Sequence, residues 1–173
     1  MARTTAPSSI EALMLQALAI EREAVARYGE LADMMETHNN GEVAQLFRQM
    51  AQYEQHHVEH ILADMGWAED VIVPRQGDLW STPESPEAVP IEEMHYLMHP
   101  WHALNLALAA ERRALAFFEG LARDASSDAI RRVAEEMRDE EAQHVALVQA
   151  WLARVPAPGP DWSVDPDPPR HVD

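Results

Sequence analysis

A repeated segment of fifteen residues most strongly limits the folds open to this chain. Residues 18–32 read LAIEREAVARYGELA and residues 108–122 read LAAERRALAFFEGLA, and eight of the fifteen positions are identical. Apolar residues recur in both copies at intervals of three and four, which is the pattern of an amphipathic helix. A helical segment that occurs twice in one chain predicts two similar structural units that pack together.

The segments that follow the two copies are also alike. Each carries a methionine, a Glu-x-x-His motif and a valine, at Met50, Glu54, His57 and Val58 and again at Met137, Glu141, His144 and Val145. Four long helical segments are therefore expected, at about residues 10–35, 42–65, 101–124 and 129–155. Short turns join the first to the second and the third to the fourth, which predicts two antiparallel hairpins. We predict an all-α four-helix bundle built from two repeated helical hairpins joined by a long crossover.

Polar and proline-rich segments mark the boundaries of these units. Ser8 precedes Glu11 by three residues and Asn39 precedes Glu42 by three, so each pair predicts a helix start with a capping box. The crossover, about residues 66–100, is rich in proline, and a short helix is expected after its proline at position 90. We assign residues 1–155 to the bundle, and expect the Pro/Asp-rich tail, residues 156–173, to be extended or disordered.

Composition excludes several classes of function. The chain has no cysteine, which excludes disulfides, thiolate catalysis, iron–sulfur clusters and cysteine-ligated zinc. Thirty acidic and thirteen basic residues give a formal charge of −17, which repels nucleic acids and anionic membranes. No segment approaches the roughly 20 apolar residues of a membrane span, and the N-terminus lacks the apolar core of a signal peptide. A soluble, cytoplasmic protein is expected.

Ionisable residues interrupt the apolar stripe of each helical segment near its middle. The first and third segments carry a single glutamate there and the other two carry Glu-x-x-His, so that the six residues are Glu21, Glu54, His57, Glu111, Glu141 and His144. Burying four carboxylates together is costly unless cations lie between them or protons return to them. Two divalent cations balance four carboxylates, and carboxylate and imidazole ligands suit iron, manganese or zinc. The pattern predicts a dinuclear metal centre, with a buried ion-pair network as the alternative.

The remaining histidines give weaker signals. A third Glu-x-x-His, from Glu92 to His95, lies in the crossover without a repeat partner and is interpreted as a chance match. His56 and His60 point away from the stripe of His57, so we expect a solvated helix face there, with a surface metal site as the alternative. Auxiliary metal binding remains open for the histidines of the crossover region, which are His95, His99 and His102.

The motifs EREAVARY, EQHH and EAQH resemble the rubrerythrin branch of the ferritin-like superfamily, and the resemblance covers about residues 9–154. It implies Glu21 and Glu111 as terminal ligands, Glu54 and Glu141 as bridging ligands, and His57 and His144 as one imidazole per metal. The implied cofactor is two iron ions, with manganese or zinc possible. The resemblance also implies that Tyr28 donates a hydrogen bond beside the centre.

Two departures from the family shape the functional hypothesis. Rubrerythrins usually carry a four-cysteine rubredoxin domain and an extra glutamate one turn after the third-helix ligand, but this chain has no cysteine and has Ala114 at that position, with Ala24 as its repeat mate. We expect a diiron oxidoreductase, of ferroxidase or peroxidase type, that reacts Fe(II) with O2 or peroxide and takes electrons from iron or an external donor. The alternatives are a diiron hydroxylase of a small or lipid-like substrate and a non-catalytic iron-storage protein. A homodimer without nucleic acid or membrane partners is expected.

Overall fold

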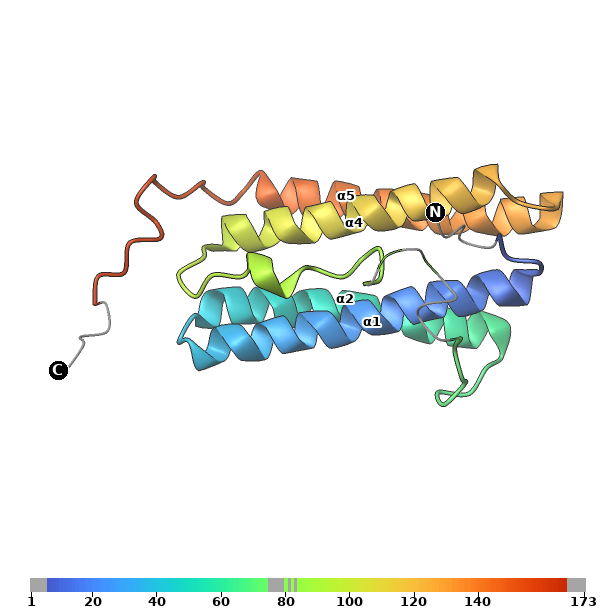
Figure 1. The fold of residues 1–173 in the computed structure, drawn as a ribbon, viewed down its shortest axis with the longest axis horizontal. Coiled ribbons are helices and arrows are strands. Elements are labelled where there is room, and N and C mark those ends of the chain that lie inside the picture. Colours follow the sequence, from blue (N-terminus) through green and yellow to red (C-terminus); the bar gives the residue numbers. More distant parts are fainter. Residues whose placement is uncertain (1–5, 75–79, 81, 83, 168–173) are drawn as a thin grey trace.

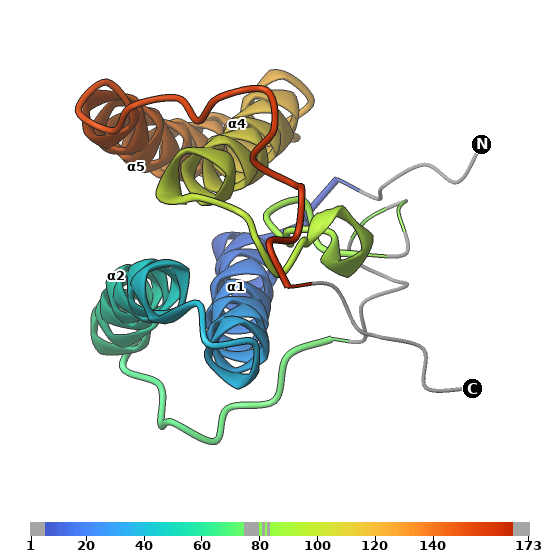
Figure 2. The ribbon, with the colours of Figure 1, turned by 90° about the vertical axis from the view of Figure 1, so that its left-hand side faces the viewer.

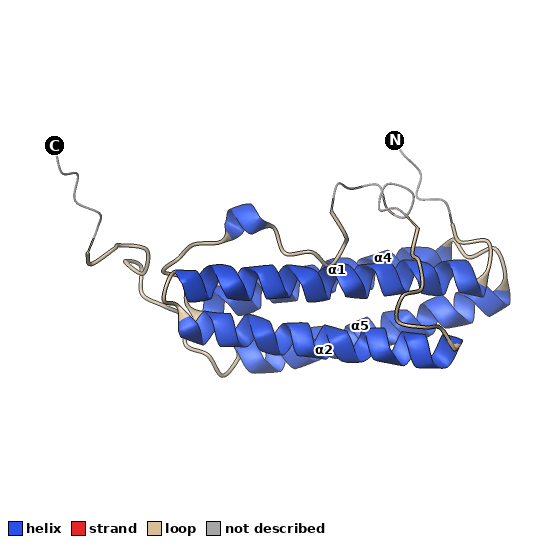
Figure 3. Cartoon of the chain, turned by 90° about the horizontal axis from the view of Figure 1, so that it is seen from below, coloured by secondary structure: helices blue, strands red, loops and turns tan. Residues whose placement is uncertain are grey.

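Four long helices form the protein. The computed structural model describes residues 6–74, 80, 82 and 84–167. Its helices are α1 (Ile10–Thr37), α2 (Gly41–Met65), α4 (Pro100–Arg123) and α5 (Asp128–Leu152), with a short 3-10 helix, η1 (Ile91–Glu93), in the crossover. The described residues contain no strand, which confirms the predicted all-α class (Figure 3). Within them, every helix is too polar or too short to span a lipid bilayer.

The helices are arranged as two antiparallel hairpins, as predicted. α1 packs along α2 and α4 along α5, and the sparser contacts between the hairpins join α1 to α5 and α2 to α4. The crossover returns along the length of the bundle, so that α4 begins at the end where α1 stops (Figure 1). Viewed along the helices, the crossover leaves α2 and passes around α1, and its later part, residues 84–99, lies on the side formed by α1 and α4 (Figure 2).

Side-chain caps begin the helices. The Ser9 hydroxyl accepts a hydrogen bond from the backbone N–H of Ala12 at 3.0 Å, and the Asn40 side chain accepts one from the N–H of Val43 at 3.3 Å. The predicted starts at Ser8 and Asn39 were therefore one residue too early. Asn39 instead takes a left-handed conformation, with φ of 58°, that closes the turn between α1 and α2.

Two apolar clusters fill the bundle, one on each side of its charged middle. One cluster contains Tyr28, Phe47 and Leu104, and the other contains Leu13 and Phe118. All five side chains are at most 1% exposed. Apolar packing above and below a shared level keeps water away from polar groups placed between the clusters, and raises the cost of leaving such groups charged.

The tail folds back onto the crossover. Residues 156–167 contain no helix. The ring of Trp162 lies 4.0 Å from that of His102 and 5.1 Å from that of His95, between centroids. The Tyr96 hydroxyl donates to a carboxylate oxygen of Asp165 at 2.7 Å. These contacts give the histidines around the start of α4 packing roles.

Candidate metal centre

The four glutamates of the helical stripes are all buried at the middle of the bundle. Glu21 on α1, Glu54 on α2, Glu111 on α4 and Glu141 on α5 are each at most 1% exposed. Each lies on the inward face of its helix, because the apolar residues three and four positions away turn that face toward the core. The sequence pattern thus brings one carboxylate from every helix into a common space.

A fifth buried carboxylate, from the crossover, joins them. Glu87 is 1% exposed. The side chains form three groups of possible metal ligands, and within each group the ligand atoms lie within 4.8 Å of one another. The groups are Glu54–Glu111–His144, Glu21–Glu54–Glu87 and Glu87–Glu111–Glu141. Because Glu54, Glu87 and Glu111 each belong to two groups, the cluster is continuous and has room for neighbouring ions. Sequence reasoning missed Glu87, since a proline-rich loop has no periodicity that reveals which side chain is buried.

The two Glu-x-x-His histidines have different surroundings. The Nδ1 atom of His144 lies 3.3 Å from Oε2 of Glu111 and 3.4 Å from Oε2 of Glu141. His57 belongs to none of the three groups. Its ring lies 4.2 Å from the ring of His144, and its Nδ1 lies 4.0 Å from Oε2 of Glu140. Both rings are therefore on the α2 and α5 side of the cluster, but within the described residues only His144 contacts its carboxylates.

His56 and His60 are exposed and lie outside the cluster, as the helical stripe predicts.

Burial makes this site hold protons in the absence of a cation. Desolvation, and then the charge of Glu111, raise the pKa of Glu54 from 4.5 to about 8. Burial lowers the pKa of His144, but the adjoining carboxylates of Glu111 and Glu141 outweigh it and raise that pKa to about 11. For His57, burial and the charge of His144 lower the pKa to about 4. At neutral pH, His57 therefore keeps the lone pair that a metal needs.

Unpaired oxygens test whether a metal fits these residues. Among the described residues, neither carboxylate oxygen of Glu21 or of Glu87 has a hydrogen-bond partner, and the cationic group beside Glu111 and Glu141 is His144, with its Nδ1 atom at 3.3 and 3.4 Å. One oxygen of Glu54, Oε2, has none either. Native proteins rarely bury unpaired polar atoms, because each costs about 1–3 kcal/mol and more when charged. Cations between the carboxylates remove this cost, so the donor set fits metal ions that prefer oxygen and nitrogen ligands.

A small pocket leads to the cluster between α2 and α5. Its volume is about 90 Å³, and the candidate ligands that line it are Glu54, His57, Glu111 and His144. Its other walls are mainly apolar and are formed by Met50, Tyr53, Leu147, Val148 and Trp151. Tyr53 is 40% exposed and Leu147 is 49% exposed, so the pocket approaches the surface at these side chains.

Comparison with known proteins identifies the family of the chain. The family model for rubrerythrin matches residues 12–152. The chain belongs to the rubrerythrin family. Proteins of this family are typically diiron oxidoreductases with the ferritin-like fold. The chain is also similar to an uncharacterized conserved protein from Magnetospirillum magnetotacticum MS-1, whose crystal structure is known. The two sequences are 33% identical, and the structures superpose with a TM-score of 0.60 over 84% of this chain and 95% of that chain. A comparison with curated proteins gives no match.

Tyr28 is the remaining candidate that the rubrerythrin resemblance implies. It is 1% exposed, and its ring stacks on Phe47 with the centroids 6.0 Å apart. Burial and the negative charges of Glu111 and Glu54 raise the pKa of its hydroxyl. That hydroxyl has no hydrogen-bond partner in the described part of the chain. Its position suits donation toward the carboxylates, and the hydrogen bond itself stays a prediction.

Proposed function

We propose that the protein is a diiron oxidoreductase in which iron, held as Fe(II) by the buried cluster, reacts with O2 or peroxide. The observation that carries this proposal is the set of buried carboxylates without hydrogen-bond partners beside His144. Two bound Fe(II) ions supply two electrons, which with two protons convert peroxide to two waters or O2 to peroxide. The family supports iron as the metal and redox chemistry as the activity.

The chain's residues supply ligands and exchange protons in this proposal. The proposed ligands are Glu21, Glu54, His57, Glu111, Glu141 and His144. His57 has a lowered pKa and is neutral at pH 7, whereas the raised pKa values of His144 and Glu54 mean that they release protons when metal binds. Tyr28 is proposed to orient a carboxylate by donating its hydroxyl proton.

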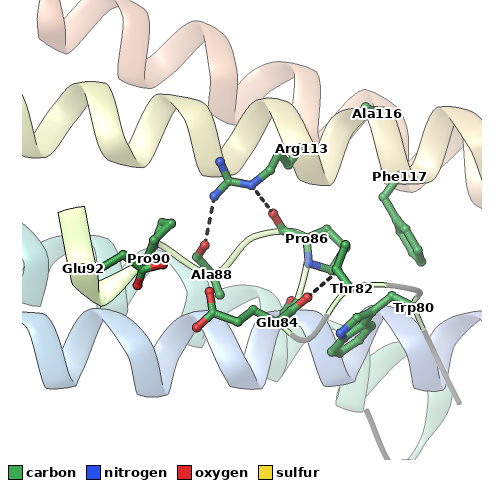
Figure 4. A pocket seen from close by; sticks show the side chains of 11 residues that line it. Trp80, Thr82, Glu84, Pro86, Ala88, Pro90, Glu92, Arg113, Ala116 and Phe117 are labelled. Carbon is green, nitrogen blue, oxygen red and sulfur yellow. Dashed lines mark hydrogen bonds between the residues drawn. The ribbon is translucent and has the colours of Figure 1, made fainter. Parts of the chain in front are cut away.

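Pocket volumes favour a small oxidant over an organic substrate. Ligand pockets for organic molecules usually measure about 300–1,000 Å³. A pocket of about 740 Å³ lies between the crossover and α4, but none of the candidate ligands lines it (Figure 4). The pocket of about 90 Å³ that the ligands do line has room for a molecule of a few atoms. This contrast supports O2 or peroxide over the hydroxylase alternative.

Stopped-flow oxidation of the loaded protein tests the proposal. Apoprotein is loaded anaerobically with two Fe(II) per chain, O2 and peroxide are added separately, and absorbance follows oxidation. We expect bound iron to oxidise faster than free Fe(II) in the same buffer, and one peroxide to be consumed per two irons. Oxidation of bound iron at the rate of free iron would refute the proposal.

A matched pair of variants tests the path of the oxidant. Leu147 lines the small pocket and Gln149, exposed on the same helix, does not. Leu147→Trp should slow oxidation without changing iron content, and Gln149→Trp should leave both unchanged. Equal rates in the two variants would show that the oxidant enters elsewhere.

The source of electrons separates ferroxidase from peroxidase activity. With no cysteine for a rubredoxin centre, reducing equivalents come either from incoming Fe(II) or from a separate donor protein. Turnover with repeated additions of Fe(II), compared with turnover of peroxide in the presence of a chemical reductant, distinguishes the two. We also propose a homodimer, which light scattering on a sizing column measures.

A further inference from the structure

We propose that Glu87 of the crossover is a fifth carboxylate ligand of the metal centre. The inference rests on the proposed function, because it concerns the same dinuclear site. With Glu87 included, the carboxylate ligands come from the crossover as well as from the four helices.

The surroundings of Glu87 point to a cation. Its oxygens belong to one group of possible ligand atoms with Glu21 and Glu54 and to another with Glu111 and Glu141, each within 4.8 Å. The side chain is 1% exposed, and neither of its oxygens has a hydrogen-bond partner in the described residues. A carboxylate turned toward four others without a single donor is unfavourable unless positive charge lies among them or protons return to them. No arginine, lysine or histidine pairs with Glu87 in the described residues, so metal is the partner that fits.

Apolar packing holds the crossover in the core of the bundle beside Glu87. Val89, two residues further along the crossover, is fully buried in the same apolar cluster as Ala24 of α1 and Ala107 and Ala110 of α4. The burial of Val89 fixes the backbone of the loop two residues from Glu87.

Three charged side chains hold the segment around Glu87 in place. Arg113 of α4 donates to the carbonyl oxygens of Pro86 and Ala88, both at 2.9 Å, and so holds the residues on each side of Glu87 (Figure 4). From α1, Arg27 donates to the carbonyl oxygen of Val89 and to Glu84, at 3.0 Å for the latter.

Glu23 of α1 completes the grip on the crossover. It accepts a hydrogen bond from the backbone N–H of Ser85 at 3.4 Å. Glu23 and Arg113 occupy the same position in the two copies of the repeat. The two copies therefore differ in charge at this position. Glu23 accepts from the loop backbone, and Arg113 donates to it.

The position of Glu87 gives the centre two different sides. The crossover approaches from α1 and α4 (Figure 2). The small pocket is lined by His57 of α2 and His144 of α5, with Glu111 as its one lining residue from α4 among the described residues. A fifth carboxylate makes the ligand set more negative than two divalent ions can balance. It therefore favours the more highly charged oxidised metal and lowers the reduction potential of the centre.

Metal titration of a charge-neutral variant tests the proposal. Glu87→Gln keeps the shape of the side chain and removes its charge. Glu93→Gln is the matched control, because Glu93 lies in the same crossover and is exposed. Calorimetry with anaerobic Fe(II), and with Zn(II) as a redox-inactive probe, measures affinity and stoichiometry. We expect Glu87→Gln to lower the affinity for at least one of the two ions tenfold or more. We also expect it to raise the melting temperature of the apoprotein. Glu93→Gln should bind metal as the wild type does.

A second variant and the wild type keep the outcomes distinct. Glu87→Asp retains the charge on a shorter side chain and should bind metal more weakly than wild type but more strongly than Glu87→Gln. If the wild type binds two ions and Glu87→Gln binds both equally well, the role of Glu87 is refuted and the proposed function stands. If the wild type binds fewer than two ions, both proposals fail.

Discussion

Replacement of Glu54 by glutamine should change apoprotein stability and metal binding in opposite directions. Glu54 is 1% exposed, and burial followed by the charge of Glu111 raises its pKa from 4.5 to about 8. At pH 7 this carboxyl group is protonated in the folded chain and ionised in the unfolded chain. Folding must therefore protonate Glu54 at a pH above its unfolded pKa. This protonation costs about 1.4 kcal/mol for each pH unit above 4.5, or about 3 kcal/mol at pH 7.

Glutamine removes this cost but leaves its own amide without a partner, which costs about 1 kcal/mol. The net expectation is that Glu54→Gln stabilises the apoprotein by about 2 kcal/mol at pH 7, which raises the melting temperature by roughly 4–8 °C for a domain of this size. A group with a raised pKa stabilises the fold fully below its unfolded pKa and loses that contribution as pH rises to the folded value. The advantage of glutamine should therefore vanish near pH 5 and grow until about pH 8.

Thermal melts of both proteins in a chelator, at pH 5, 6, 7 and 8, measure this difference. Glu59→Gln, an exposed position on the same helix, is the control and should show no comparable trend. Metal titrations of the same samples should show that Glu54→Gln loses affinity. A variant that is less stable than wild type at every pH, or a difference that does not grow with pH, would refute the account of buried, protonated carboxylates.

Three further substitutions test separate parts of the structure. Tyr28→Phe removes the hydrogen bond that the hydroxyl is proposed to donate to a carboxylate, so it should lower the unfolding free energy of the metal-loaded protein by about 1 kcal/mol in thermal melts. It should also leave two metals per chain in elemental analysis, and loss of a metal would instead make the hydroxyl a ligand. His144→Ala should lose metal and His56→Ala, at an exposed position, should keep it, so equal losses would contradict the assignment. Arg113→Gln removes two hydrogen bonds to the crossover and should lower the unfolding free energy by about 1–2 kcal/mol. Hydrogen exchange of residues 84–90 should accelerate in that variant. Unchanged exchange would refute the role of Arg113 in holding the crossover.

The helices and their pairing follow from local physics that the sequence displays. Apolar periodicity, the repeat and the turn residues predict four helices in two hairpins, and the structure confirms them. The helix starts were one residue off because adjacent serines and asparagines offer equivalent caps. The choice between Asn39 and Asn40 depends on which residue takes the left-handed turn, and periodicity carries no information about it.

The burial of the glutamates was predictable where helices carry them and not where the crossover does. The stripe pattern selected the four helical glutamates, and the structure places all four together. Glu87 was missed because the loop around it is held through the backbone of its neighbours by Arg113 and Glu23, which are far away in the sequence. The two Glu-x-x-His motifs are equivalent in sequence. The structure separates them, because within the described residues only His144 contacts the carboxylates of the cluster.

An anaerobic Fe(II) titration of the apoprotein tests the central claim most directly. Calorimetry in two buffers of different ionisation enthalpy, combined with metal analysis, gives the number of irons bound and the number of protons released. The account predicts two irons per chain and a net release of protons at pH 7, because His144, with a pKa of about 11, and Glu54, with a pKa of about 8, hold protons that metal displaces. Binding of fewer than two irons, or binding of two without proton release, would contradict it.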